Sequence, residues 1–223
     1  MNRPLLLRAL AFSGIFIPLV VLGWLIIRPG EELPIFHPKQ IDARLVDPAV
    51  RNTPGEHRIS DFRLVDQRGD TITLAAVDGR IIVADFFFTT CGTICPKMTA
   101  QMERVQAAYR TDDRVAILSH SVTPEIDTPE VLAAYAQLHG ADPARWHMLT
   151  GDRAQIYRLA RQSYFACLEE GDGGPDDFVH TENFVLVDAQ RRIRGFYDGT
   201  QQAEVDRLIA DIGKLLAEQE RSA

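Results

Sequence analysis

Residues 81–98 have the sequence IIVADFFFTTCGTICPKM, which carries the strongest structural signals of the chain. Residues 81–88 are almost continuously apolar, which is typical of a strand that is covered on both faces. Residues 95–109 carry apolar side chains at helical spacing, and Pro96 suits the first turn of a helix. The sequence therefore predicts a buried strand that delivers a Cys-x3-Cys motif to the start of a helix.

Strand and helix patterns alternate on both sides of this segment. A hairpin is expected where two short apolar runs flank Gly69, and a second hairpin near Ala189. Strand–helix–strand units that end in a hairpin and a helix predict an α/β domain, with a central mixed sheet covered by helices. The further expected strands are 62–65, 71–74, 115–119, 146–149, 184–188 and 192–197, and the further expected helices are 129–138, 153–161 and 204–218.

The chemistry is concentrated in Cys91 and Cys95. A helix N-terminus favours negative charge, so it should lower the pKa of a thiol there and make a thiolate available. The spacing also lets two sulfurs meet, either in a disulfide or around a soft metal ion. Thiolates suit Cu(I), and a two-sulfur site readily accepts an imidazole as a third ligand. A purely structural disulfide is the simpler alternative.

The N-terminal region predicts a membrane anchor. Residues 9–27 form a 19-residue stretch without a charged side chain, close to the length that spans a bilayer. Arg3 and Arg8 precede it, whereas all 31 acidic residues lie at Glu31 or later. This charge bias predicts a cytoplasmic N-terminus and an extracytoplasmic domain. A cleaved signal peptide is the alternative, although its apolar core would be shorter and followed by small residues.

Three segments are expected: an anchor at residues 1–28, a proline-rich tether at 29–56 and a globular domain at 57–223. The tether contains five of the twelve prolines, which disfavour regular structure. Its second half fits a loop packed on the domain equally well. A net charge of −7 argues against a nucleic-acid partner.

The sequence VADFFFTTCGTICPKM (residues 83–98) resembles the signature of the Sco/SenC family. The similarity extends through SVTPEIDTPEVL (121–132), HTENFVLVD (180–188) and RIRGFYDG (192–199), and so covers nearly all of residues 57–215. Members of this family are membrane-anchored proteins with a thioredoxin-like fold. They bind copper and help to assemble the binuclear copper centre of cytochrome c oxidase. The resemblance implies the same fold here, preceded by one transmembrane helix.

The resemblance also implies a site and its partners. The two motif cysteines and the distal histidine of the family fall on Cys91, Cys95 and His180, as ligands of copper in the Cu(I) or Cu(II) state. The implied partners are the copper-bearing subunit of cytochrome c oxidase and an upstream copper donor. The implied location is the inner (cytoplasmic) membrane, with the domain on its periplasmic side. Two positions depart from the family pattern: Gly92, where proline is frequent, and Thr123, where aspartate is usual.

Other residues near the motif have both a functional and a structural interpretation. Asp85 interrupts an apolar strand, and it either relays protons beneath the cysteines or faces a solvated edge or a cation. Met98 and Met102 share a helical face and are expected to pack in the core, with soft copper ligation as the alternative. Cys167 is expected to be inert or an auxiliary thiol, and the acidic residues 169–177 form a loop before His180.

The other five histidines lack cysteine neighbours in the sequence. His37 and His57 lie in or beside the tether and are expected to be solvated, while His120, His139 and His147 are left without a role.

Two functions follow. The first is a copper metallochaperone, and the alternative is a membrane-tethered thiol–disulfide oxidoreductase that uses Cys91 and Cys95 as its redox pair. The sequence favours the metallochaperone over an enzyme and leaves the exchange activity open, because both functions need reactive thiolates at the same helix start.

Overall fold

The computed structural model describes residues 16–17, 19, 32–166 and 182–222. The chain divides into two compact units, Met1–Glu32 and Leu33–Ala223. In the first unit, Phe16 and Ile17 are helical and more than half exposed. No helix within the described residues is long and apolar enough to cross a membrane. The predicted anchor lies almost wholly outside those residues and stays a prediction.

The second unit is built on a five-stranded mixed sheet with the strand order β5-β4-β3-β6-β7. The central strand, β3, pairs in parallel with β4 and antiparallel with β6. Strand β5 extends the parallel half and β7 the antiparallel half. The strands are β3 (Ile81–Phe87), β4 (Val115–Ser121), β5 (Trp146–Leu149), β6 (Asn183–Val187) and β7 (Ile193–Asp198). The predicted central mixed sheet is confirmed.

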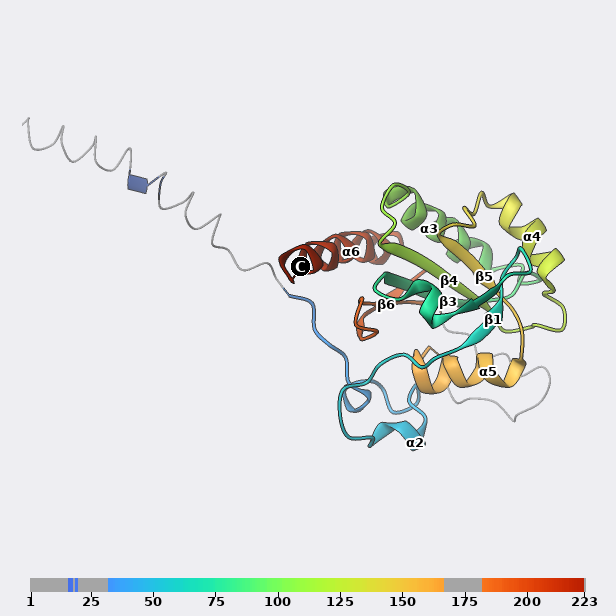
Figure 1. The fold of residues 1–223 in the computed structure, drawn as a ribbon, viewed down its shortest axis with the longest axis horizontal. Coiled ribbons are helices and arrows are strands. Elements are labelled where there is room, and N and C mark those ends of the chain that lie inside the picture. Colours follow the sequence, from blue (N-terminus) through green and yellow to red (C-terminus); the bar gives the residue numbers. More distant parts are fainter. Residues whose placement is uncertain (1–15, 18, 20–31, 167–181, 223) are drawn as a thin grey trace, which may run out of the picture. The chain divides into compact units, whose positions relative to one another are not determined.

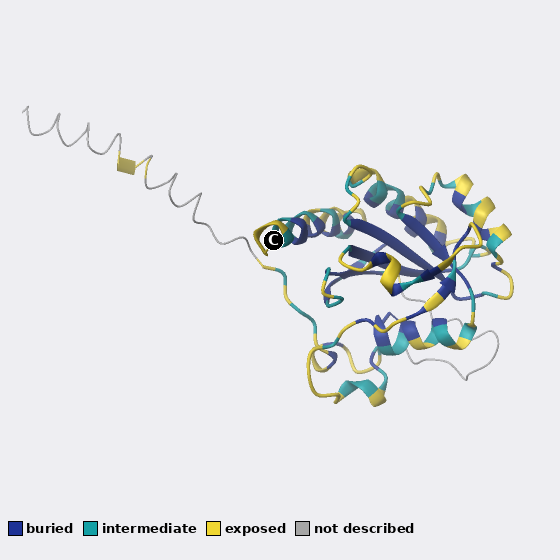
Figure 2. Cartoon of the chain, viewed as in Figure 1, coloured by how far each residue is buried: buried dark blue, intermediate teal, exposed yellow. Residues whose placement is uncertain are grey.

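Helices cover both faces of this sheet (Figure 1). Helices α3 (Ile94–Ala108), α4 (Pro129–Leu138) and α6 (Gln202–Ser222) lie on one side, and α5 (Arg153–Arg158) lies on the other. The alternation of side chains along β3 divides the core accordingly. Ile82, Ala84 and Phe86 belong to the cluster on the α5 side, whereas Ile81 and Val83 belong to the cluster on the side of α3 and α6. Figure 2 shows the sheet strands as the most buried part of the molecule.

Local signals explain where the helices begin. The Thr128 side chain accepts a hydrogen bond from the Val131 N–H and caps α4, and Pro129 follows at the first helical position. The Asp152 side chain caps α5 in the same way through the Gln155 N–H. After α5 the chain continues as one π-helical turn, Leu159–Ser163. The expected helix at 153–161 is therefore two consecutive helical segments.

Residues 33–62 pack against the domain. This stretch contains the short helices η1 (Pro38–Gln40) and α2 (Pro48–Arg51), and Ile41 and Val46 are buried in the core. It belongs to the same compact unit as the sheet. The burial of Val46 agrees with the packed-loop interpretation of the second half of the tether, and Ile41 in the first half is buried as well. His57 is half-buried, and its Nε2 lies 2.8 Å from the Ser163 carbonyl oxygen. The expectation that His57 is solvated was wrong.

The first hairpin forms a separate two-stranded sheet. Strands β1 (Arg63–Val65) and β2 (Thr71–Thr73) are antiparallel, as predicted, and the turn between them contains Gly69 at φ 81°. The short helix η2 (Leu74–Val77) then leads into β3. Leu64, Ile72 and Leu74 join the core on the α5 side of the main sheet.

Candidate functional site: the cysteine pair after β3

The two motif cysteines lie where the predicted strand ends and the predicted helix begins. A turn follows β3, closed by a hydrogen bond from the Cys91 N–H to the Phe88 carbonyl oxygen (3.3 Å). Cys91 is half-buried in the loop, and Cys95 is buried in the first turn of α3. Both cysteines are free thiols. The Cys95 N–H donates to Cys91 Sγ over 3.4 Å, so this backbone donor points at the sulfur of Cys91.

The surroundings of the two thiols drive their pKa values apart. Burial raises the pKa of Cys91, but hydrogen bonds from the N–H groups of Cys95 and Thr93 outweigh it and lower the pKa to about 7. Burial raises the pKa of Cys95 to about 12, against a backbone hydrogen bond with Phe88, and the neighbouring Cys91 adds to the rise. At neutral pH, Cys91 is therefore poised to be a thiolate while Cys95 holds its proton.

Asp85 lies in β3 on the same side of the sheet as Cys95, and it is 3% exposed. The Ser119 hydroxyl, on the paired residue of β4, donates to Asp85 Oδ1 (2.5 Å) and accepts from Trp146 Nε1 (2.9 Å). Burial raises the pKa of Asp85 to about 7, and the Ser119 hydrogen bond opposes that rise. The solvated-edge interpretation of Asp85 is therefore wrong. A carboxyl group with this pKa can exchange a proton at neutral pH.

The two departures from the family pattern have different surroundings. Gly92 is exposed, and a Cβ built at this position meets no atom within 4 Å. Thr123 is 3% exposed, and its hydroxyl donates to Asp127 Oδ2 (3.0 Å). Thr123 therefore serves an internal hydrogen bond, and its side chain is not part of the surface around the cysteines.

The methionines of α3 pack in the core. Met98 is 2% exposed and Met102 is fully buried, and both belong to the apolar cluster that also contains Val105 and Leu208. The expectation of core packing is confirmed for both residues.

His180, Cys167 and residues 169–177 lie outside the described residues. Among the residues that are described, no group of three or more His, Cys, Asp and Glu side chains is arranged to hold a metal ion. The described part of the chain thus brings together Cys91 and Cys95, two of the three predicted ligands. Their thiol sulfurs suit a soft metal ion, and the place of His180 as the third ligand stays a prediction.

A polar chain from α4 reaches Cys95 and was missed by the sequence analysis. The Tyr135 hydroxyl lies 2.8 Å from Thr99 Oγ1, and the Thr99 hydroxyl donates to the Cys95 carbonyl oxygen (2.9 Å). Burial raises the pKa of Tyr135 to about 12, which keeps its hydroxyl protonated. Thr99 lies four residues after Cys95, the spacing of a side chain that bonds back to its own helix, and this was the available signal.

His120 is a second residue whose environment the sequence left open. It is fully buried on the α5 side of β4, stacked on Phe86 with ring centroids 4.8 Å apart. Burial lowers the pKa of His120 to about 4, so the imidazole is neutral at pH 7. Because it faces away from Ser119 and Cys95, His120 does not belong to the cysteine site.

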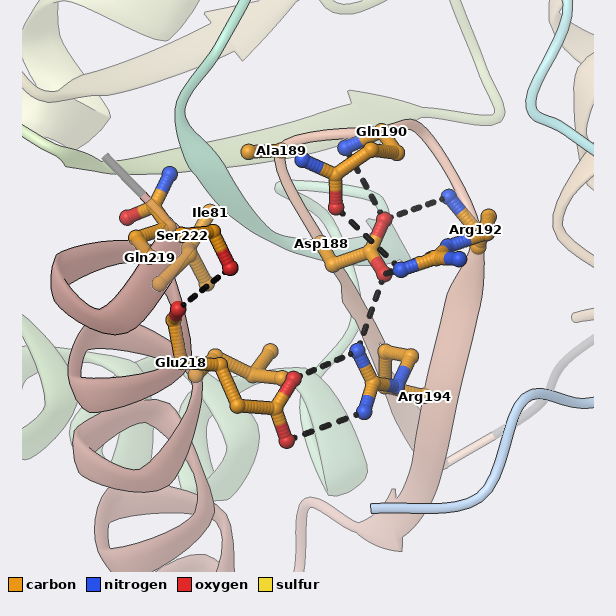
Figure 3. Close-up of a pocket in the computed structure, with 10 residues that line it drawn as sticks. Ile81, Asp188, Ala189, Gln190, Arg192, Arg194, Glu218, Gln219 and Ser222 are labelled. Atoms are coloured by element: carbon orange, nitrogen blue, oxygen red, sulfur yellow. Dashed lines mark hydrogen bonds and ion pairs between the residues drawn. The ribbon is translucent and has the colours of Figure 1, made fainter. Parts of the chain in front are cut away.

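A charged cluster lies near the first residue of β3, at the end of the strand that is opposite to the cysteines (Figure 3). Asp188 stands between Arg192 and Arg194, and Arg194 also pairs with Glu218. These residues line a pocket of about 90 Å³ together with Ile81, the first residue of β3. Arg194 further donates to the Leu33 carbonyl oxygen (2.7 Å) and so holds the beginning of the compact unit against β7. Neither Cys91 nor Cys95 lies in this cluster.

Comparison with known proteins identifies the family. The family model described as SCO1/SenC matches residues 50–217, about three quarters of the chain. The chain belongs to the SCO1/SenC family. The match includes the described cysteines, and the observed mixed sheet with flanking helices is the thioredoxin-like fold of Sco proteins.

Individual Sco proteins are similar over most of their length. The SCO1 protein homolog of Bacillus subtilis (strain 168) is 32% identical over 161 residues, which cover 71% of this chain and 83% of that protein. The structure of BsSco has a TM-score of 0.61 and 30% identity, over 71% of this chain and 93% of that one. BsSco is a member of the Sco family of cytochrome c oxidase assembly proteins, and a disulfide switch has been identified in it.

A copper-bound structure is also similar. ScoI of Bradyrhizobium japonicum with copper bound has a TM-score of 0.57 and 25% identity, covering 71% of this chain and 99% of that chain.

Proposed function

We propose that this Sco protein binds copper through Cys91, Cys95 and His180 and passes it to the binuclear copper site of cytochrome c oxidase. The observation that carries the proposal is the pair of free thiols at the start of α3, with a backbone N–H donor 3.4 Å from the more accessible sulfur. The copper-bound relative and the assembly function stated for BsSco support it.

The chemistry of the pair suits copper as a cargo. Thiolates are soft ligands that favour Cu(I), and a thiol must lose its proton before it binds the ion. The lowered pKa of Cys91 makes this sulfur the first to be available at neutral pH. Cys95 releases its proton only against its raised pKa, so the ion must compete with that proton at the second sulfur. Copper uptake should therefore release protons and strengthen with pH.

Delivery requires that the site and its acceptor meet on the same side of a membrane. We propose that residues 1–28 anchor the chain in the cytoplasmic membrane with the N-terminus inside and the compact unit outside. The uncharged stretch 9–27 and the basic residues before it support this topology. A reporter that is active only outside the cytoplasm should work when it is fused after residue 60. A mature protein that begins near residue 30 would contradict the proposed anchor.

The function is tested with His180→Ala in the full-length chain. We expect the reduced wild type to hold one Cu(I) against a competing chelator, and His180→Ala to lose at least tenfold in affinity, the scale on which changes at metal sites act. Cys91→Ser should abolish binding. The matched control is His37→Ala, which removes an exposed histidine of the described chain and should leave the affinity unchanged. Equal copper affinity in His180→Ala and wild type would exclude the imidazole as a ligand.

Thiol–disulfide exchange is the second candidate, and the asymmetry of the two thiol pKa values favours it. The Cys91 thiolate would attack a substrate disulfide, forming a mixed disulfide and releasing one substrate sulfur as a thiolate. Cys95 would then give up its proton, for which Asp85 is the available acceptor on the same side of the sheet, and attack Cys91 Sγ. This step forms the Cys91–Cys95 disulfide and releases the second substrate thiolate.

The same variants separate the two functions. Exchange needs only the two cysteines, so His180→Ala should keep its rate with a small disulfide substrate while it loses copper. Alkylation of Cys91 should reach half of its maximal rate near pH 7, since the thiolate is the reacting form. Rapid reduction of protein disulfides by a wild type that ignores copper would favour the oxidoreductase.

A further inference from the structure

The buried carboxylate of Asp127 joins the loop that carries Cys91 to the end of the neighbouring strand. Asp127 lies just before α4 and is fully buried. Its oxygens accept hydrogen bonds from the Thr89 N–H (3.2 Å), the Thr89 hydroxyl, the Ser121 hydroxyl (2.5 Å) and the Thr123 hydroxyl (3.0 Å). Burying a carboxylate is costly unless hydrogen-bond donors surround it, and these four hydrogen bonds offset that cost for Asp127.

The donors come from both sides of the gap between two parallel strands. Ser121 ends β4, and Thr123 lies in the turn that follows it. Thr89 lies two residues after β3, inside the turn that the Cys91 N–H closes on the Phe88 carbonyl oxygen. Thr89 alone contributes two of the four hydrogen bonds. The carboxylate therefore holds the cysteine loop by a side chain and a backbone group of the same residue.

We propose that Asp127 is a positioning residue of the cysteine site, which fixes the turn before Cys91 through Thr89 and thereby places Cys91 Sγ relative to α3. The geometry that depends on this placement is the 3.4 Å approach of the Cys95 N–H to the Cys91 sulfur. A hydrogen bond weakens steeply with distance and angle, so a small movement of the turn is sufficient to lose it. The inference rests on the proposed function only in taking the two cysteines as the reacting groups.

The structure offers a matched pair of variants. Thr89→Val removes the hydroxyl donor on the cysteine loop, and Thr123→Val removes a hydroxyl donor to the same carboxylate from the other side. Each variant leaves Asp127 one donor short and keeps the size of the side chain. We expect both to lower Tm by a similar amount, about 2–4 °C for one lost hydrogen bond in a chain of this size. Only Thr89→Val should alter the site.

Two readouts at the site distinguish positioning from stability. In Thr89→Val, the full-length chain should bind Cu(I) about tenfold more weakly, as is usual for residues that orient a ligand. The thiol–disulfide equilibrium with glutathione should shift by a similar factor against the reduced form, because the reduced sulfur loses its N–H donor. Thr123→Val should stay within about twofold of wild type in both, and Thr89→Ser should restore both constants, since the donor is again present.

The proposal is overturned by either of two results. If Thr89→Val lowers Tm but changes neither constant, the Asp127 hydrogen bonds only stabilise the fold. If Thr123→Val changes the constants as much as Thr89→Val does, the effect passes through the fold as a whole. A wild type that binds no Cu(I) contradicts the proposed function, and in that case the glutathione equilibrium still decides the role of Asp127.

Discussion

The two ends of β3 are stabilised in different ways. At its first residue, the charged cluster of Asp188, Arg192, Arg194 and Glu218 pairs opposite charges directly, with two arginines between carboxylates. At its last residues, the polar groups meet hydroxyl and backbone donors instead, as Asp85 does with Ser119. Ion pairs at one end thus contrast with neutral donors at the other.

The difference explains why the reactive groups lie at only one of these ends. An ion pair holds its partners in their charged forms, whereas the burial of Asp85 raises its pKa and the Ser119 hydroxyl only partly opposes that rise. Asp85 and Cys91 accordingly both have a pKa of about 7, reached from opposite directions. The charged cluster fixes the beginning of the compact unit through the Leu33 carbonyl oxygen, and the cysteine end retains groups that can exchange protons.

The largest effect is expected from breaking the charged cluster. Arg194→Met removes a cation that is 4% exposed from between Asp188 and Glu218. Glu218 then loses its arginine partner, and Asp188 keeps only the more exposed Arg192. Removing this buried cation should lower the free energy of unfolding by about 3–5 kcal/mol, measured by urea denaturation at pH 7. The pH profile of Cys91 alkylation should not move. A shifted profile would show that the two ends of β3 are coupled.

The second effect tests the cysteine end through Asp85→Asn. The pKa of Asp85 is raised by burial from 3.8 to about 7, so the folded chain binds this proton more tightly than the unfolded chain. Its contribution to stability is therefore complete below pH 4 and is lost as the pH rises through 7. The free energy of unfolding of wild type relative to Asp85→Asn should fall by up to about 4 kcal/mol between pH 4 and pH 8.

The control for this pH dependence is Asp61→Asn, which changes a carboxylate that is 86% exposed. It should follow the wild-type curve throughout. A pH-independent difference between wild type and Asp85→Asn would mean that Asp85 is already ionised in the folded chain across this range.

A smaller effect is expected from Met102→Leu on the core side of α3. The two side chains have similar volumes, so the substitution at this fully buried position should cost less than about 1.5 kcal/mol of unfolding free energy. Cu(I) affinity should equal that of the wild type, because Met102 packs among apolar residues. Weaker copper binding at unchanged stability would assign the thioether a place in the copper path.

The smallest effect is expected from Arg192→Met, the more exposed arginine of the charged cluster. Its side chain is 22% exposed, and Asp188 keeps Arg194 as a partner when it is removed. The loss of unfolding free energy should be about 1 kcal/mol or less by urea denaturation. A loss equal to that of Arg194→Met would show that the exposure of the two arginines does not decide their contributions.

Much of the fold could be predicted from patterns within single segments. The buried run of β3, the helical spacing of α3 and the caps of α4 are signals carried by neighbouring residues, and each predicted strand and helix of the described domain is present. The packing of the tether against the domain could not be predicted, because prolines indicate irregular structure but not what that structure contacts. His57 was placed wrongly for the same reason, since its partner Ser163 is 106 residues away.

Two cysteines after a buried strand, at the start of a helix, could be recognised without the structure, because spacing and local periodicity are properties of adjacent residues. The family could be recognised in the same way, through motifs that extend along most of the domain. Three features required the folded chain: Ser119 lies beside Asp85, Thr89 donates to Asp127, and the two thiols differ in pKa. These depend on strand register and burial, which arise from contacts between residues far apart in the chain.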